Sequence, residues 1–179
     1  VGLLFISVSF FSATYIKVDT NIFKFFKSDL KISEDLRYFD REFKGSSNID
    51  MMLDSELEEG IKEPSFLTKL DALEAFLEKQ EKSGKIVGYL DQLKQIRKAF
   101  SDNKKEFYKI PDSKPMTSQL LLLFENSGPD DDLSDIKDFD ERFTRITLPT
   151  INMDASEYNQ FLDDMMQTIN KDFPDLNVT

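Results

Sequence analysis

Pairs of neighbouring carboxylates are the side chains in this sequence whose type and spacing could support catalysis. Asp50 and Asp54 lie four residues apart, and Asp163 and Asp164 are adjacent. Two carboxyl groups can act as general acid and general base in a hydrolase. However, a chain with 34 acidic residues contains such pairs by chance. No catalytic constellation surrounds either pair, so a hydrolase is the weakest functional hypothesis, and we expect no enzymatic activity and no catalytic residue.

The sequence contains no histidine and no cysteine. Within the chain this excludes Ser-His-Asp triads, cysteine nucleophiles, imidazole bases, iron–sulfur sites and structural zinc sites. We therefore expect no cofactor. The absence of cysteine does not indicate a compartment, because such a chain suits an oxidising exterior and the cytosol equally well.

An acidic segment at residues 127–140 raises the possibility of a calcium site. An EF-hand loop needs acidic or amide side chains at alternating positions, then a glycine and a late glutamate. No glycine stands at the required place, so we interpret the segment as a solvated acidic linker with no metal ligands. Its aspartates are Asp130, Asp131, Asp132, Asp135, Asp138 and Asp140.

The overall charge limits the partners that the chain can have. Acidic residues number 34 against 23 basic ones, which gives a formal net charge of −11 over 179 residues. Nucleic-acid binding requires clustered lysine and arginine, and no such cluster stands out in the sequence, so no nucleic-acid partner is expected. Docking on an anionic lipid surface is disfavoured for the same reason. The length is typical of one domain.

An uncharged apolar run, Val1–Ile16, opens the sequence and ends at Lys17. A membrane-spanning helix needs about 20 apolar residues, and this run is slightly shorter. Because the chain also begins at Val1 rather than at a methionine, we expect residues 1–17 to be the C-terminal part of a transmembrane helix. The alternatives are the hydrophobic region of a signal peptide, or a strand or helix of a soluble core.

Hydrophobic periodicity predicts alternating strands and helices after this run. The predicted elements are a short helix that starts near Ser33 and closes with Gly45 in the left-handed conformation, strands at 49–54, 86–90, 143–153 and from 176, and helices at 64–82, 91–101, 115–126 and 154–173. The apolar residues switch from even-numbered to odd-numbered positions at Pro149, which predicts a β-bulge there. Asp154 with Glu157 predicts a capping box. Two strand–helix–strand units sharing one sheet predict a ferredoxin-like α+β fold with extra helices.

Several short motifs resemble the first part of an exporter of the RND superfamily, in its MMPL/Patched-like branch. The resemblance rests on an apolar helix running into Val18-Asp19-Thr20-Asn21, on Phe25-Phe26, on Phe43-Lys44-Gly45, on Glu63-Pro64-Ser65-Phe66-Leu67, and on Asp154-Ala155-Ser156-Glu157-Tyr158 before a helix that stops at Pro174. On this resemblance Asp19, Thr20, Asn21 and Gly45 form a family-like junction motif. Residues 18–47 would be the junction segment with a short helix, and residues 48–179 a porter domain without its complete final strand.

The resemblance implies a proton-driven exporter of hydrophobic or lipid-like compounds in the bacterial inner (plasma) membrane. The chain would then be its first extracytoplasmic loop, facing the periplasm or the cell exterior. The implied partners are the lipid bilayer, the cargo and the second extracytoplasmic loop of the same transporter. The proton-coupling carboxylates of the family lie in later membrane helices, outside this sequence. The alternative is a membrane-anchored or secreted, non-enzymatic α+β module that binds a lipid or a partner protein.

Overall fold

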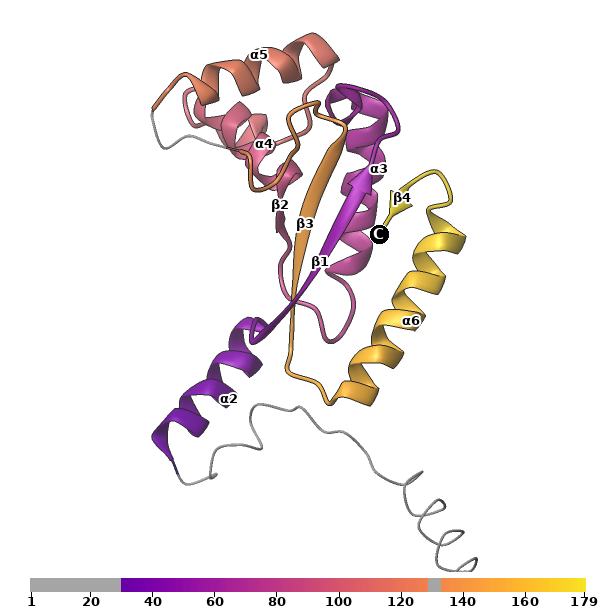
Figure 1. Cartoon of the computed structure of the whole chain (residues 1–179). Coiled ribbons are helices and arrows are strands. Elements are labelled where there is room, and N and C mark those ends of the chain that lie inside the picture. The colour runs from indigo at the N-terminus through magenta and orange to yellow at the C-terminus, as the bar shows by residue number, and fades with distance from the viewer. Residues whose placement is uncertain (1–29, 129–132) are drawn as a thin grey trace, which may run out of the picture.

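The computed structural model describes residues 30–128 and 133–179 and has an α+β architecture, as predicted (Figure 1). Its helices are α2 (Lys31–Phe43), α3 (Pro64–Leu77), α4 (Tyr89–Ala99), α5 (Lys114–Glu125) and α6 (Ala155–Asp172), with short 3-10 helices η2 (Gly60–Lys62) and η3 (Lys105–Phe107). Its strands are β1 (Ser47–Asp54), β2 (Val87–Gly88), β3 (Phe143–Thr150) and β4 (Asn177–Val178).

The four strands form one antiparallel sheet in the order β2-β3-β1-β4. β1 and β3 pair over all eight residues of each strand, from Ser47 opposite Thr150 to Asp54 opposite Phe143. β2 and β4 each add two residues at the two edges. The long β1–β3 pair therefore makes up most of the sheet, and each short outer strand extends it over only two residues.

The predicted β-bulge at Pro149 is wrong. Pro149 lies opposite Asn48 in an unbroken register, and β3 ends one residue later at Thr150. Ile151 and Met153 follow the end of the strand, where the chain turns towards α6. The switch of the apolar residues from even-numbered to odd-numbered positions therefore marks the end of β3, and not an extra residue within it.

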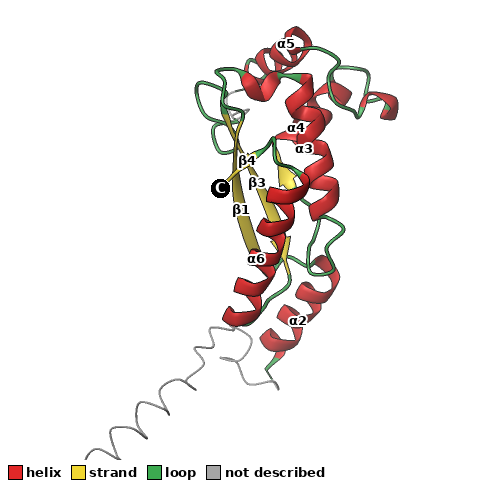
Figure 2. Cartoon of the chain, turned by 90° about the vertical axis from the view of Figure 1, so that its right-hand side faces the viewer, coloured by secondary structure: helices red, strands yellow, loops and turns green. Residues whose placement is uncertain are grey.

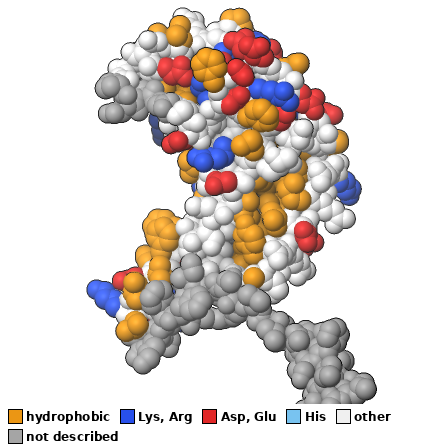
Figure 3. All heavy atoms as spheres, in the orientation of Figure 1, with side chains coloured by type: hydrophobic (Ala, Val, Ile, Leu, Met, Phe, Trp, Pro, Cys, Tyr) orange, Lys and Arg blue, Asp and Glu red, His pale blue; other side chains and the backbone are white. Residues whose placement is uncertain are grey.

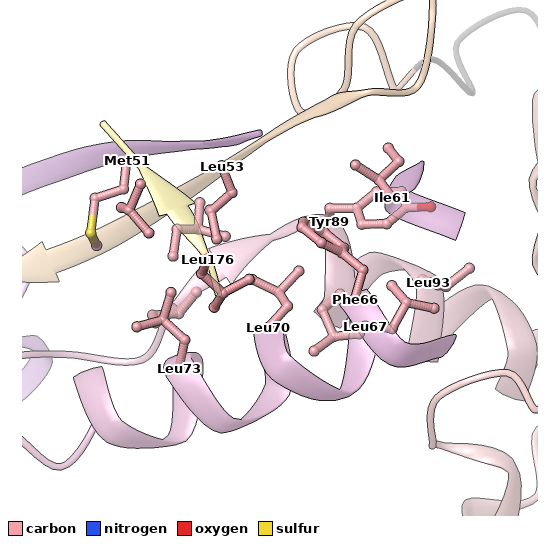
Figure 4. Close-up of a cluster of buried hydrophobic side chains, with 14 of the residues drawn as sticks. Met51, Leu53, Ile61, Phe66, Leu67, Leu70, Leu73, Tyr89, Leu93 and Leu176 are labelled. Atoms are coloured by element: carbon pink, nitrogen blue, oxygen red, sulfur yellow. The ribbon is translucent and has the colours of Figure 1, made fainter. Parts of the chain in front are cut away.

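Helices α3 and α6 cover one face of the sheet (Figure 2). On β1 the buried positions are Ile49, Met51 and Leu53, which alternate with more exposed residues as predicted. Figure 4 shows the inward side chains of α3 directed towards the strands. The labelled members of this core are Met51, Leu53, Ile61, Phe66, Leu67, Leu70, Leu73, Tyr89, Leu93 and Leu176. The burial of apolar surface on this side of the sheet is the main stabilising term of the domain.

Helices α4 and α5, joined through η3, form a second helical layer at one end of the sheet (Figure 1). α5 begins with Ser113 as its N-cap, whose hydroxyl accepts a hydrogen bond from the Met116 N–H at 3.4 Å. Pro115 occupies the first turn, where its missing N–H costs nothing. Leu93 of α4 and Leu121 of α5 are buried and join this layer to the main core.

Several predicted boundaries differ from the structure for local reasons. α3 ends at Leu77, not at residue 82, and the Glu78 carboxylate accepts the Ile86 N–H at 3.0 Å as the chain turns back. The strand predicted at 86–90 is only Val87–Gly88, because Tyr89 already starts α4.

Two predicted helix caps are also wrong. The left-handed residue after α2 is Lys44, with φ of 48°, and not Gly45. Asp154 is the N-cap of α6, but its side chain makes no capping hydrogen bond. The reciprocal pair of hydrogen bonds of a capping box is therefore not formed, and Glu157 makes an ion pair with Lys82 at 2.6 Å.

Across residues 30–128 and 133–179, no helix is both long and apolar enough to cross a membrane. The segment predicted to be the end of a transmembrane helix, residues 1–17, lies outside these ranges. The junction residues Asp19, Thr20 and Asn21 also lie outside them.

Candidate functional site

An exposed apolar stripe runs along α2. Ile32, Leu36, Phe39 and Phe43 recur at helical spacing, which places them on one side of the helix. Phe39 and Phe43 are 45% and 62% exposed, and their rings stack with centroids 5.0 Å apart. Figure 3 shows hydrophobic side chains on the surface of α2. The helix also carries charges of both signs on Lys31, Glu34, Asp35, Arg37, Asp40, Arg41 and Glu42. α2 is thus a strongly amphipathic helix whose apolar side is exposed at Ile32, Phe39 and Phe43 and half-buried at Leu36.

The C-terminal end of α2 is fixed to the end of the sheet. The Asp40 carboxylate accepts hydrogen bonds from the Ser46 hydroxyl and, at 2.9 Å, from the Asn152 N–H. The Lys44 ammonium donates to the Glu81 carbonyl at 2.7 Å. Gly84 packs so closely that an added Cβ would lie 2.9 Å from the Lys44 carbonyl oxygen. These contacts hold the helix beyond the end of the sheet, where Figures 1 and 2 both place it.

The face of the sheet opposite α3 and α6 holds a cavity of about 240 Å³. Met52, Ile136 and Phe143 contribute apolar surface to its walls. Beside the cavity, Arg142 donates two hydrogen bonds to the Asp54 carboxylate, at 2.7 and 2.6 Å. This hydrogen bonding lowers the pKa of Asp54. The Arg142–Asp54 pair ties the loop before β3 to β1, and the cavity is open to solvent.

A chain of ion pairs joins the sheet to the α4–α5 layer. Lys62 lies 2.9 Å from Glu59 and also pairs with Glu141, while Lys137 lies 3.2 Å from Glu141 and 3.0 Å from Glu125. The two lysine side chains are only 8% and 12% exposed. Burial alone would lower the pKa of Lys62, but its hydrogen bonds to Glu141 and Glu59 outweigh burial and raise it. Each of these groups has at least one partner of opposite charge, so we assign them a structural role.

Glu74 is a buried carboxyl group between α3 and α4. Its Oε1 atom has no hydrogen-bond partner within the described residues. Burial raises the pKa of Glu74 to about 7; Lys94 opposes this rise, and the carboxylates of Asp71, Glu78 and Asp91 add to it. Lys94 itself pairs with Asp71. Glu74 can therefore take up or release a proton near neutral pH, a property often found at functional sites.

The structure separates the residues that the sequence marked as candidates. Gly45 lies in the turn between α2 and β1, where a Cβ would make only ordinary contacts of 3.6 Å or more. Asp50 and Asp54 lie four residues apart on one strand, a spacing of about 13 Å. Asp163 and Asp164 are consecutive on α6 and point in different directions. The spacing of Asp50 and Asp54 exceeds the separation of about 5–9.5 Å that acid–base catalysis of glycoside hydrolysis requires.

The acidic segment contributes a turn in the part that the structure describes. The Asp138 carboxylate accepts the backbone N–H groups of Arg142 and Phe143 at 2.8 and 2.7 Å. Asp130, Asp131 and Asp132 lie outside the described residues. Within the described ranges, no group of three or more acidic side chains could hold a metal ion.

Sequence reasoning missed Glu74 and the buried lysines. A signal for Glu74 was present, because it follows Leu70 by four residues and precedes Leu77 by three on the apolar side of α3. A glutamate within an apolar stripe is expected to be buried. No comparable signal marks Lys62 or Lys137 as buried. Each has one partner nearby in sequence, Glu59 and Glu141 respectively, but the other partner of each comes from a different part of the chain.

Comparison with known proteins gives no further assignment. No family model, curated protein or solved structure matches this chain.

Proposed function

We propose that this chain is the extracytoplasmic domain of a proton-driven exporter of hydrophobic or lipid-like compounds, located at the bacterial inner membrane. The observation that carries the proposal is the exposed apolar stripe of α2, close in sequence to the apolar run Val1–Ile16. The intervening residues 17–30 span at most about 50 Å when fully extended. If Val1–Ile16 lies in a bilayer, α2 remains near the membrane surface, where an amphipathic helix buries its apolar face.

The sheet supports a ferredoxin-like arrangement for this domain. β1 and β2 both run antiparallel to β3, so they are parallel to each other, with α3 between them in sequence. By the same reasoning β3 and β4 are parallel, with α6 between them. Two βαβ units that share one sheet with their helices on one face are the pattern expected of a porter-type domain of the resembled family.

The apolar surfaces suggest where the implied partners would bind. The stripe on α2 would face lipid, and the cavity on the open face of the sheet would contact hydrophobic cargo or the second extracytoplasmic loop of the same transporter. Met52, which is 49% exposed, lines this cavity. The alternative is a membrane-anchored binding module. It shares the contact between α2 and lipid but does not move cargo.

Transport can be tested with the complete gene product in inverted membrane vesicles. The probe is the lipophilic fluorophore N-phenyl-1-naphthylamine, and the readout is its redistribution after a proton gradient is imposed. The proposal predicts gradient-dependent movement that a protonophore abolishes and that vesicles without the protein do not show. Movement that is unaffected by the protonophore, or equal in the two kinds of vesicle, would refute the transport role.

Contact between α2 and lipid can be tested separately, because the chain contains no cysteine. Phe43→Cys carries an environment-sensitive fluorophore, and Phe139→Cys, at a position 98% exposed and distant in sequence, is the matched control. Addition of phosphatidylcholine vesicles should shift the emission of the label at position 43 to shorter wavelength and leave that at position 139 unchanged. Equal emission at both positions would contradict a membrane-facing α2. A shift at position 43 without transport would favour the binding-module alternative.

A further inference from the structure

A second cavity, of about 330 Å³, lies beside α4 and has a different charge from the rest of the molecule. It is lined by Lys85, Gln95, Lys98, Lys105 and Tyr108. Three of these five residues are lysines and none is acidic, although acidic residues outnumber basic ones 34 to 23 in the chain. By contrast, the cavity on the sheet face and two cavities beside Asp175 each include at least two acidic side chains.

The chain reverses direction directly after α4, and this reversal brings η3 back alongside the helix. Asp102 and Asn103 both adopt left-handed backbone conformations, with φ of 55° and 56°, which aspartate and asparagine tolerate better than most residues. The Asn103 N–H donates to the Lys98 carbonyl at 3.1 Å. The tight turn therefore places Lys105 of η3 next to the side of α4 that carries Lys98.

Hydrogen bonds from two side chains, Arg97 and Tyr108, hold the following loop against α4. Arg97, whose side chain is 3% exposed, donates to the Asp112 carboxylate at 2.7 Å and to the Ile110 carbonyl. The Tyr108 hydroxyl donates to Asp91 in the first turn of α4. Because both ends of the loop are fixed, the wall of the cavity that carries Lys105 is formed before any ligand binds. Less conformational entropy is then lost when a ligand binds.

The lysines of this cavity are largely unpaired. Lys98 and Lys105 form no ion pair within the described residues, and the Lys85 ammonium lies 3.6 Å from its acidic neighbour, Asp91. Ammonium groups bind phosphate oxygens as point charges, and the Gln95 amide adds a neutral donor. The ring of Tyr108 adds apolar surface beside these donors.

We propose that this cavity, formed by Lys85, Lys98, Lys105, Gln95 and Tyr108, binds a phosphate group. The group is either free inorganic phosphate or the headgroup of an anionic amphiphile, since the cavity volume exceeds that of phosphate alone. This inference depends on the geometry around α4 and is independent of the transport role.

The test is isothermal titration calorimetry on the full 179-residue chain in a nonionic detergent at low ionic strength. One titrant is sodium phosphate and the other is dihexanoyl phosphatidic acid, a short-chain phospholipid with the same terminal group. The site variant combines Lys98→Gln with Lys105→Gln. The matched control combines Lys79→Gln with Lys171→Gln, two exposed lysines elsewhere that remove the same total charge.

Loss of two charge-assisted contacts should weaken binding by about tenfold or more in the site variant, whereas the control should bind within about twofold of the wild type. Binding of inorganic phosphate would identify free phosphate as a sufficient ligand, and binding of the phospholipid alone would identify a headgroup site. The proposal is overturned if the wild type binds neither titrant or if both double variants lose affinity equally. Should the site variant not fold, Lys105→Gln alone, at an exposed position, should still weaken binding about threefold, and an unchanged affinity would overturn the proposal.

Discussion

Replacing Glu74 with glutamine is expected to stabilise the protein above pH 7 and to have little effect near pH 4.5. Glu74 is 8% exposed and its Oε1 atom has no hydrogen-bond partner within the described residues. Burial, assisted by Asp71, Glu78 and Asp91 and opposed by Lys94, raises its pKa from 4.5 to about 7. Glutamine has nearly the same shape but cannot ionise, so the comparison isolates the cost of the buried charge.

The sign follows from proton linkage. Between pH 4.5 and 7 the folded protein keeps a proton on Glu74 that the unfolded chain has already released. Unfolding therefore releases a proton, and the free energy of unfolding contributed by this group falls as the pH rises. Each pH unit between the unfolded and folded pKa values of Glu74 corresponds to about 1.4 kcal/mol, so ionisation of this group lowers the free energy of unfolding by about 3 kcal/mol above pH 7. The glutamine variant should avoid this loss.

The assay is urea-induced unfolding followed by far-ultraviolet circular dichroism at pH 4.5, 6, 7 and 8. We expect the stability difference between Glu74→Gln and the wild type to grow from near zero at pH 4.5 to about 3 kcal/mol at pH 8. Glu58→Gln, at an exposed position, is the matched control and should give a difference close to zero at every pH. A difference that stays constant from pH 4.5 to 8 would show that Glu74 is not the titrating group.

Three further substitutions test other parts of the structure by the same urea assay. Tyr89→Phe should raise the free energy of unfolding by about 1 kcal/mol, because the buried hydroxyl has no partner in the described residues; a decrease would reveal a hydrogen bond. Lys62→Met should lower the free energy of unfolding by about 3 kcal/mol, because Glu141 loses a partner of opposite charge. An unchanged free energy of unfolding would mean that the ion-pair network is dispensable. Gly84→Ala should cost about 1–3 kcal/mol and speed amide exchange in α2, because the new Cβ would lie 2.9 Å from the Lys44 carbonyl oxygen; unchanged exchange would show that Gly84 does not fix α2.

The elements with strong local periodicity could be predicted from the sequence. The alternation of Ile49, Met51 and Leu53 predicted β1, and the apolar stripe of α6 predicted its helix almost to the residue. In these segments the side chains that face the core are spaced by the geometry of a single element. The order of strands and helices predicted an α+β fold, and the antiparallel pairing of β1 with β3 agrees with it.

Features that depend on distant residues could not be predicted. The early start of α4 at Tyr89 and the regular pairing of Pro149 are consequences of tertiary packing. The cavity beside α4 needed the turn at Asp102 to bring Lys105 back towards Lys98. Lys98 and Lys105 are seven residues apart in the sequence. Lys98 falls near the end of a predicted helix and Lys105 in the polar loop that follows, so no local pattern predicts that they are neighbours.

The pairing of β1 with β3 also has a kinetic consequence. Arg142 and Asp54, at the end of this pair, are 88 residues apart, and closing a flexible loop of that length costs about 4 kcal/mol in chain entropy. The segment between them contains α3, α4 and α5, whose contacts are more local in sequence. We expect these helices to form first during refolding and to shorten the effective loop, so that docking of β1 onto β3 limits the rate. Newly made chain would then hold β1, with its apolar face uncovered, unpaired until residue 150 has been synthesised, which exposes this strand to misassembly.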